Sequence, residues 1–196
     1  MAKLRTYPAK PWPRSRGWLI PSGPNANCTP LGYSIAHRVA RDLGTLERPL
    51  TSNWGGRVAT MIKRFGFKGP LKWCGFQVGV CWIDCNALVP DRFWDCDAWA
   101  EHMVPMEHVH PLDLVGSAIL YGKPGDLYHI EIITRAELSP DKVIQTAGGN
   151  RGYAGAPTND GAGTFEYPTW RHDIRGIVVP KLAHGMTIVD PFAQPW

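Results

Sequence analysis

The sequence predicts an α+β fold, in which N-terminal helices pack on a small antiparallel β-sheet. Between residues 31 and 85, apolar residues recur every three to four positions, which is the period of amphipathic helices. After residue 115 the period shortens, and brief β-rich runs are separated by Gly, Pro and Asp turns. Helices that precede the strands, rather than alternate with them, favour α+β over a parallel sheet.

The first expected helix lies in TPLGYSIAHRVARDLGT and ends at Gly44. Its apolar positions, spaced by four, are Leu31, Ile35, Val39 and Leu43.

The second expected helix lies in TSNWGGRVATMIKRFGF. A side chain among Thr51, Ser52 and Asn53 is expected to cap it, because these residue types accept hydrogen bonds from the free N–H groups of a first turn. Its apolar side is formed by Val58, Met61, Ile62 and Phe65.

The third expected helix runs from Cys74 to about Cys85, after a loop spanning 66–73. Cys74, Val78, Cys81 and Cys85 follow at offsets that place all four on one helical face. Residues 90–104, rich in aromatics, are expected to be helical or irregular.

Four strands are expected, at 116–122, 128–134, 142–147 and 176–180. The Gly-rich, polar segment 148–172 is expected to form a surface loop beside the site. Five prolines before residue 25 indicate an extended arm. The predicted organisation is therefore a Pro-rich arm at 1–30 and a folded domain at 31–196.

The composition excludes several classes of protein. Hydrophobic residues make up 44% and charged residues 19% of the chain, the balance of a globular protein. Lys and Arg are scattered and the net charge is only +4, so nucleic acid is not an expected partner. No apolar stretch is long enough to span a membrane, and no secretory signal is evident. Five cysteines, an odd number, fit a reducing compartment, so synthesis in the cytoplasm is expected.

Cys74 is the best candidate for a nucleophile, because a helix N-terminus stabilises a thiolate. His129, at the head of a strand, is the candidate base, and Asn150 is the candidate that orients its ring. Strand alternation puts Glu131 on the same face as His129, so Glu131 is an alternative third member or a substrate contact. Trp73 is expected either in a substrate groove or in the core.

The segments LKWCGF, GSAILYG, YHIEIIT and TAGGN together resemble the CHAP and NlpC/P60 group of papain-like cysteine peptidoglycan hydrolases. The resemblance covers residues 51–150 and implies a papain-like domain in which Cys74 is nucleophile, His129 base and Asn150 orienter. The chain departs from the usual pattern at Tyr128, Ser117 and Gly148, where the group has glycine, an acid and glutamate. Glu131 stands where a small residue is common.

The resemblance implies hydrolysis of an amide bond in peptidoglycan at the bacterial cell wall, as an amidase or endopeptidase. The lack of a signal peptide suits a phage lysin or a virion-associated lytic enzyme, and the arm at 1–30 is expected to dock it to a larger phage or secretion assembly. Two alternatives remain: a non-catalytic structural or tail component of a virion with a hydrolase-like fold, and a thiol acyltransferase or deamidase that acts on a protein.

No cofactor and no metal are expected. Some members of the group bind calcium, but the acidic residues here lack the spacing of an EF-hand. The remaining candidate ligands do not match a paired zinc pattern, and their histidines are more readily explained as a polar loop that offers minor substrate contacts. These candidates are His102, His108, His110, Asp113, Cys81, Cys85 and Cys96.

Overall fold

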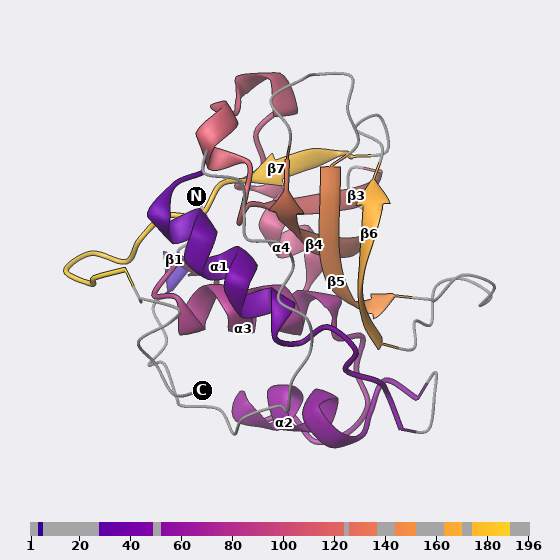
Figure 1. Cartoon of the computed structure of the whole chain (residues 1–196). Helices are drawn as coiled ribbons and strands as arrows, with labels where there is room; N and C mark the ends of the chain where they lie inside the picture. The colour runs from indigo at the N-terminus through magenta and orange to yellow at the C-terminus, as the bar shows by residue number, and fades with distance from the viewer. Residues whose placement is uncertain are drawn as a thin grey trace.

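A computed structural model describes residues 4–5, 28–48, 52–123, 126–136, 144–151, 163–169 and 174–188. It confirms the α+β class, with helices first and an antiparallel sheet after them (Figure 1). Most of the Pro-rich arm lies outside the described residues. Within the predicted arm, β1 (Leu4–Arg5) pairs antiparallel with β2 (Val89–Pro90), and the last residue, Pro30, already belongs to the first helix.

The first two helices form close to where the sequence predicts them. α1 (Pro30–Ala40) begins with proline in its first turn, and the Gly32 N–H donates to Thr29 Oγ1 at 3.1 Å. α2 (Gly56–Arg64) follows Gly55, which provides no side-chain cap. The expected caps Ser52 and Asn53 are therefore wrong, and Thr51 lies outside the described residues. The backbone of Gly55, at φ +98°, makes the turn instead.

α3 (Cys74–Asp84) is the central helix, and every one of its residues is buried. It packs against β4 and β5 of the sheet, and α1 and α2 pack against it from other sides. The four-residue spacing therefore predicted the helix but not its surroundings, because no face of α3 is left to solvent. After it come α4 (Cys96–Ala100) and two short 3₁₀ helices, η1 (Met106–His108) and η2 (Pro111–Asp113).

The sheet has five antiparallel strands in the order β6-β5-β4-β3-β7. Their bounds are β3 (Ala118–Lys123), β4 (Asp126–Arg135), β5 (Ile144–Arg151), β6 (Gly163–Thr169) and β7 (Gly176–Val178). The expectation of one loop over 148–172 is wrong, because this stretch contains the end of β5 and all of β6. β6 is an edge strand, and an edge tolerates its Pro168.

Both faces of the sheet are covered at its centre. Ala118 and Leu120 of β3 belong to the main core, together with apolar residues of α1, α2 and α3. Ile119, between them, belongs to a second cluster with Val109 and Leu114 of the 3₁₀ segment. Alternate residues of one strand thus enter different cores, as the pleat requires. No helix in the described part of the chain is long and apolar enough to cross a membrane.

Candidate active site

Cys74 is the first residue of α3, at the point where the loop enters the central helix. The free N–H groups of a first turn and the helix dipole favour a negative charge at this position. The backbone N–H of Gly75 adds a small effect in the same direction, since it lowers the Cys74 pKa. The residue is only 3% exposed, so the thiol is almost completely shielded from solvent.

His129 on β4 contacts both Cys74 and Glu131. Its Nε2 lies 3.0 Å from Glu131 Oε1, and its side chain keeps 16% of its surface exposed. The imidazole is also close enough to the Cys74 side chain for each group to shift the pKa of the other. Because Glu131 occupies Nε2, Nδ1 is the ring nitrogen available to the thiol. The residues thus form a chain of thiol, imidazole and carboxylate.

The surroundings favour a thiolate at Cys74. The hydrogen bond from Cys96 lowers the pKa of Cys74 well below its ordinary value, burial opposes this, and the bond and charge of His129 lower it further. Burial disfavours a charged imidazole, but the hydrogen bonds to Cys74 and Glu131, with their charges, raise the pKa of His129 to about 10. Both shifts favour the pair of charges, a thiolate on Cys74 and an imidazolium on His129.

The Glu131 carboxylate is fully buried and held by hydrogen bonds. Its Oε2 accepts from Tyr121 Oη at 2.8 Å and from Thr146 Oγ1 at 2.7 Å, which leaves Oε1 facing His129. Gly148 lies beside it, and a Cβ there would stand 2.5 Å from Glu131 Cγ. The missing side chain at residue 148 thus provides the space for Glu131.

Asn150 lies near the end of β5 and is buried, but no hydrogen bond joins it to His129 among the described residues. Its backbone is left-handed, with φ +60°, and its Oδ1 is buried without a hydrogen-bond partner. Of the two candidates for the orienting residue, Glu131 is the one that contacts the imidazole.

Trp73 is fully buried, which favours the core over a substrate groove. Its Nε1 donates to Glu47 Oε1 at 2.5 Å, and the other oxygen of Glu47 accepts from the Asn53 N–H at 2.7 Å. A Cβ at Gly149 would collide with the Trp73 ring. The tryptophan therefore belongs to the core and fixes the residue immediately before the thiol.

A second thiol faces Cys74. Cys96 Sγ, at the start of α4, lies 3.9 Å from Cys74 Sγ. The hydrogen bond with Cys74, together with burial, raises the pKa of Cys96 far above its ordinary value. Cys96 is therefore a protonated donor that supports the Cys74 thiolate.

The other candidate ligands do not gather. His108 and His110 are exposed, and His102 and Asp113 are partly buried. Among the described residues, no group of three or more histidine, cysteine or acidic side chains is placed to hold a metal ion. Cys81 and Cys85 are core residues of the first cluster. Burial raises the pKa of Cys81 and raises that of Cys85 to about 12, so neither thiol is activated.

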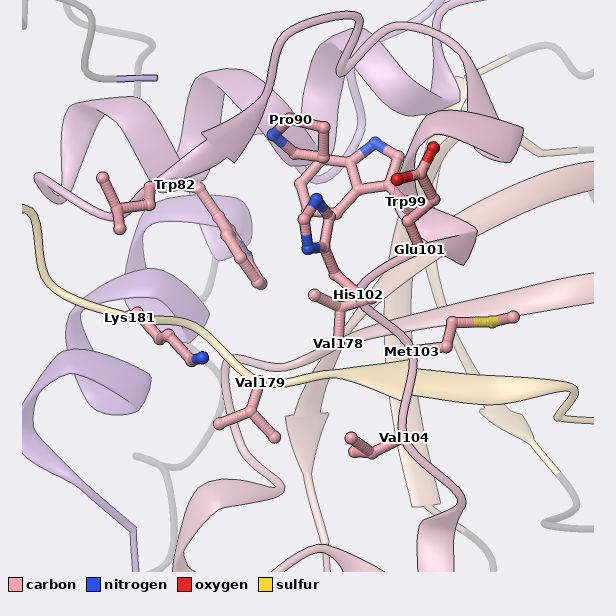
Figure 2. A pocket seen from close by; sticks show the side chains of 11 residues that line it. Trp82, Pro90, Trp99, Glu101, His102, Met103, Val104, Val178, Val179 and Lys181 are labelled. Atoms are coloured by element: carbon pink, nitrogen blue, oxygen red, sulfur yellow. The ribbon is translucent and has the colours of Figure 1, made fainter. Parts of the chain in front are cut away.

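A pocket of about 440 Å³ lies towards the other end of α3 (Figure 2). Trp82 of α3 and Trp99 of α4 line it and meet edge to face, with ring centroids 5.0 Å apart. His102 and Lys181 contribute polar side chains. None of the residues that line this pocket is a cysteine, so the thiol chemistry belongs to the Cys74 end of the helix.

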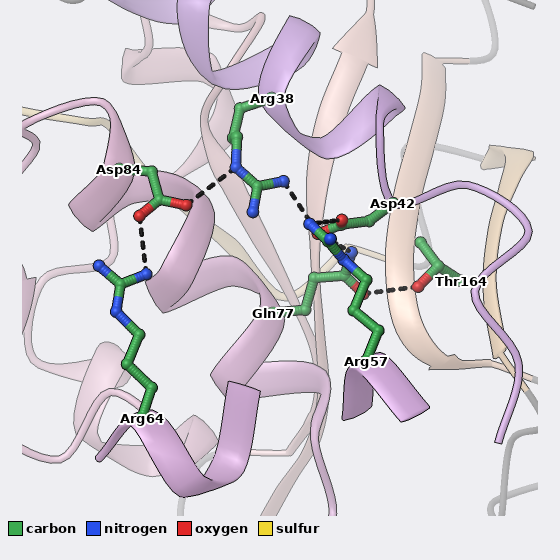
Figure 3. A network of polar contacts seen from close by, with 7 residues as sticks. All are labelled: Arg38, Asp42, Arg57, Arg64, Gln77, Asp84 and Thr164. Carbon is green, nitrogen blue, oxygen red and sulfur yellow. Dashed lines mark hydrogen bonds and ion pairs between the residues drawn. The ribbon is translucent and has the colours of Figure 1, made fainter. Parts of the chain in front are cut away.

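A buried network of charges holds α3 against its neighbours (Figure 3). Asp84, at the end of α3, pairs with Arg38 Nε at 2.9 Å and with Arg64 Nη1 at 2.7 Å. Asp42 pairs with Arg38 and Arg57.

Gln77 of α3 extends this network to the sheet. It donates to Asp42 at 3.2 Å and accepts from Thr164 of β6 at 2.8 Å. The network therefore ties α1, α2 and the edge strand β6 to α3, the helix that carries Cys74.

Sequence reasoning missed the supporting roles of Cys96, Tyr121 and Thr146. Tyr121 lies opposite His129 only because the register of the β3–β4 pair shifts by one residue between Tyr121 and Gly122, and the sequence carries no signal for that shift. Cys96 follows the helix-capping Asp95, but no local pattern says that two helix starts distant in sequence meet.

No protein-family model matches the chain, and no curated protein or solved structure matches it.

Proposed function

We propose that the protein is a cysteine hydrolase that cleaves an amide bond, with Cys74 as nucleophile, His129 as acid and base, and Glu131 as the residue that orients His129. The observation that carries the proposal is the hydrogen bond of His129 to the buried Glu131 carboxylate, in a position where His129 also lowers the pKa of the Cys74 thiol at the start of α3. A nucleophile, a base and a buried group that holds the base are what acyl transfer requires.

The first half of the reaction forms a thioester. The Cys74 thiolate attacks the substrate carbonyl carbon, and backbone N–H groups at the start of α3 stabilise the developing oxyanion. The His129 imidazolium gives its proton to the leaving nitrogen as the C–N bond breaks. Glu131 keeps the ring oriented and stabilises its positive charge.

The second half releases the acid. Neutral His129 takes a proton from water, and the resulting hydroxide adds to the thioester carbonyl. The C–S bond then breaks and returns the Cys74 thiolate, and His129 keeps the proton. Each turnover consumes one water and returns Cys74 and His129 to their starting protonation states.

The substrate class we propose is peptidoglycan, on the resemblance to papain-like hydrolases of the CHAP and NlpC/P60 group. Two of the departures from that group compensate each other. The group's acid two residues before Asn150 is replaced by Gly148, and the space this leaves is filled by Glu131, which stands where a small residue is common. In this protein the carboxylate is therefore on β4, the strand that also carries the imidazole of His129, rather than on β5.

The test is release of new amino groups and soluble fragments from isolated sacculi. We expect release by the wild-type protein, none by Cys74→Ala, and nearly full release by Cys81→Ala, which removes a buried thiol from the same helix. Fragment masses then identify the bond. Absence of release by the wild type would contradict the proposed substrate.

Two controls separate the alternatives. A Cys74 that reacts with iodoacetamide no faster than a free thiol at neutral pH would contradict catalysis and favour a structural protein. A reactive Cys74 without release from sacculi would favour acyl transfer or deamidation on a protein, which uses the same thioester.

A further inference from the structure

We propose that Cys74 and Cys96 form a reversible oxidative modification site, in which peroxide oxidises Cys74 and Cys96 closes a disulfide with it. For its effect on hydrolysis, the inference rests on the proposed function, because a Cys74 in a disulfide cannot attack a carbonyl. The disulfide itself depends only on the two thiols.

The geometry places the partners in contact before oxidation. The two sulfurs are 3.9 Å apart and belong to the first residues of α3 and α4. A disulfide needs about 2 Å between them, so the sulfurs must approach by roughly that much again. Because Cys96 packs directly on Cys74, a sulfenic acid on Cys74 would form beside its partner.

The first step requires a nucleophilic sulfur and a small oxidant. The Cys74 thiolate attacks one oxygen of hydrogen peroxide, the O–O bond breaks, and the departing hydroxide takes a proton to leave as water. The imidazolium of His129 is positioned to give that proton. Cys74 is thereby oxidised to a sulfenic acid, and the peroxide is reduced.

The second step becomes easier once the first has occurred. The thiolate of Cys74 opposes ionisation of Cys96, first through their hydrogen bond and also through its charge. A sulfenic acid is neutral, so its formation removes that opposition, while burial and the charges of Asp95 and Asp97 remain. Cys96 sulfur then attacks Cys74 sulfur, the S–O bond breaks, and the Cys96 proton leaves with the hydroxide as water.

The disulfide protects the nucleophile. A sulfenic acid without a neighbouring thiol is oxidised further to sulfinic acid, which ordinary thiols do not reduce. A disulfide between Cys74 and Cys96 stops that step, and a thiol reductant restores the original pair.

The experiment treats the purified protein with a few equivalents of hydrogen peroxide, blocks free thiols with iodoacetamide and digests with trypsin. Trypsin cuts after Lys72, Arg92 and Arg135 but not between Lys123 and Pro124, so Cys74 falls in peptide 73–92 and Cys96 in peptide 93–135. We expect these peptides to be joined through Cys74, as fragmentation shows, and to separate on reduction. A Cys81→Ser control, which keeps both partners, should give the same product.

The variant Cys96→Ser should instead accumulate a Cys74 sulfenic acid that dimedone traps, followed by sulfinic acid. The inference is overturned if wild-type Cys74 reaches sulfinic acid as fast as in Cys96→Ser, if Cys74 is not oxidised, or if the link forms through Cys81 or Cys85.

Release from sacculi is measured separately before oxidation and after reduction. A disulfide in a protein that never cleaves sacculi would overturn only the proposed function. Cleavage without a disulfide would overturn only this inference.

Discussion

Gly148 on β5 lies against Glu131 on β4, so closely that a Cβ at residue 148 would stand 2.5 Å from Glu131 Cγ. Because Gly148 has no side chain, β5 leaves a space beside β4, and the buried carboxylate of Glu131 fills that space. Access of Glu131 to His129 thus depends on glycine at this position.

Gly148→Ala should displace the Glu131 carboxylate. We expect it to lower the reactivity of Cys74 clearly, while the protein remains folded. Overpacking of this kind costs about 1–3 kcal/mol. A misplaced carboxylate should also lower the alkylation rate of Cys74 at pH 7, because Glu131 is one of the groups that raise the pKa of His129. Iodoacetamide kinetics and urea unfolding measure the two effects. The contact would be functionally irrelevant if the variant reacted at the wild-type rate.

Glu131→Gln should lower kcat/KM by about 10² to 10⁴-fold. A glutamine can accept from Tyr121 and Thr146 with its oxygen, but its NH₂ group then faces His129 Nε2 and selects the wrong tautomer. Asn150→Ala should cost less than tenfold, because Asn150 makes no hydrogen bond with the imidazole in the described structure. A larger loss in Asn150→Ala than in Glu131→Gln would reverse the assignment.

The rate of Cys74 alkylation should reach its plateau at a lower pH than that of an ordinary thiol. The hydrogen bond from Cys96 is the largest cause that lowers the Cys74 pKa, so Cys96→Ala should move the rise to higher pH, whereas Cys96→Ser keeps a donor and should move it less. Hydrolysis should fall as pH rises through about 10, where His129 loses its proton. Identical profiles for wild type and Cys96→Ala would contradict this.

Cys74 and His129 should stabilise the fold most between about pH 6.5 and 8.5, which are the ordinary pKa values of histidine and cysteine. The His129 contribution, from a raised pKa, is complete below about 6.5 and is lost as pH rises towards about 10. The Cys74 contribution, from a lowered pKa, is present above its ordinary value and is lost as pH falls through the folded value. Urea unfolding of wild type and of Cys74→Ala,His129→Gln across this range measures the difference.

Local patterns predicted the class of fold and the neighbours of the site. Four-residue spacing placed α1 and α3, and alternation on β4 put Glu131 beside His129, because both depend on residues close in sequence. β6 was missed, since its Gly-rich flanks outweighed the short β-rich run that pairs with β5.

Contacts between distant segments could not be predicted in the same way. The approach of Cys96 to Cys74 depends on how α4 folds back on α3, and the burial of Trp73 depends on Glu47, which lies 26 residues earlier. A capping side chain was expected for α2 because three suitable residues precede it, but the left-handed backbone of Gly55 satisfies the turn. Composition near a helix start does not show which residue occupies the cap.

Trp73→Phe should lower stability and leave substrate recognition unchanged. It keeps most of the buried ring but removes the N–H that donates to Glu47, so a buried carboxylate oxygen loses its partner at a cost of about 1–3 kcal/mol. Urea unfolding measures the loss, and KM of the folded variant should stay within about twofold. A raised KM with unchanged stability would instead place Trp73 in contact with substrate.

Asp84→Asn should be the most destabilising of these substitutions. Asp84 is fully buried and pairs with both Arg38 and Arg64. Asparagine has no negative charge, so the substitution removes the carboxylate that neutralises these two buried guanidinium groups. Removing one member of a buried ion pair costs about 3–5 kcal/mol. The matched control is Arg92→Ala, which breaks the exposed pair with Asp95 and should cost at most about 1 kcal/mol. Asp84 lies at the opposite end of α3 from Cys74, so the folded fraction of Asp84→Asn should keep wild-type thiol reactivity. A small loss of stability would contradict the prediction and would mean that water already reaches the charge network.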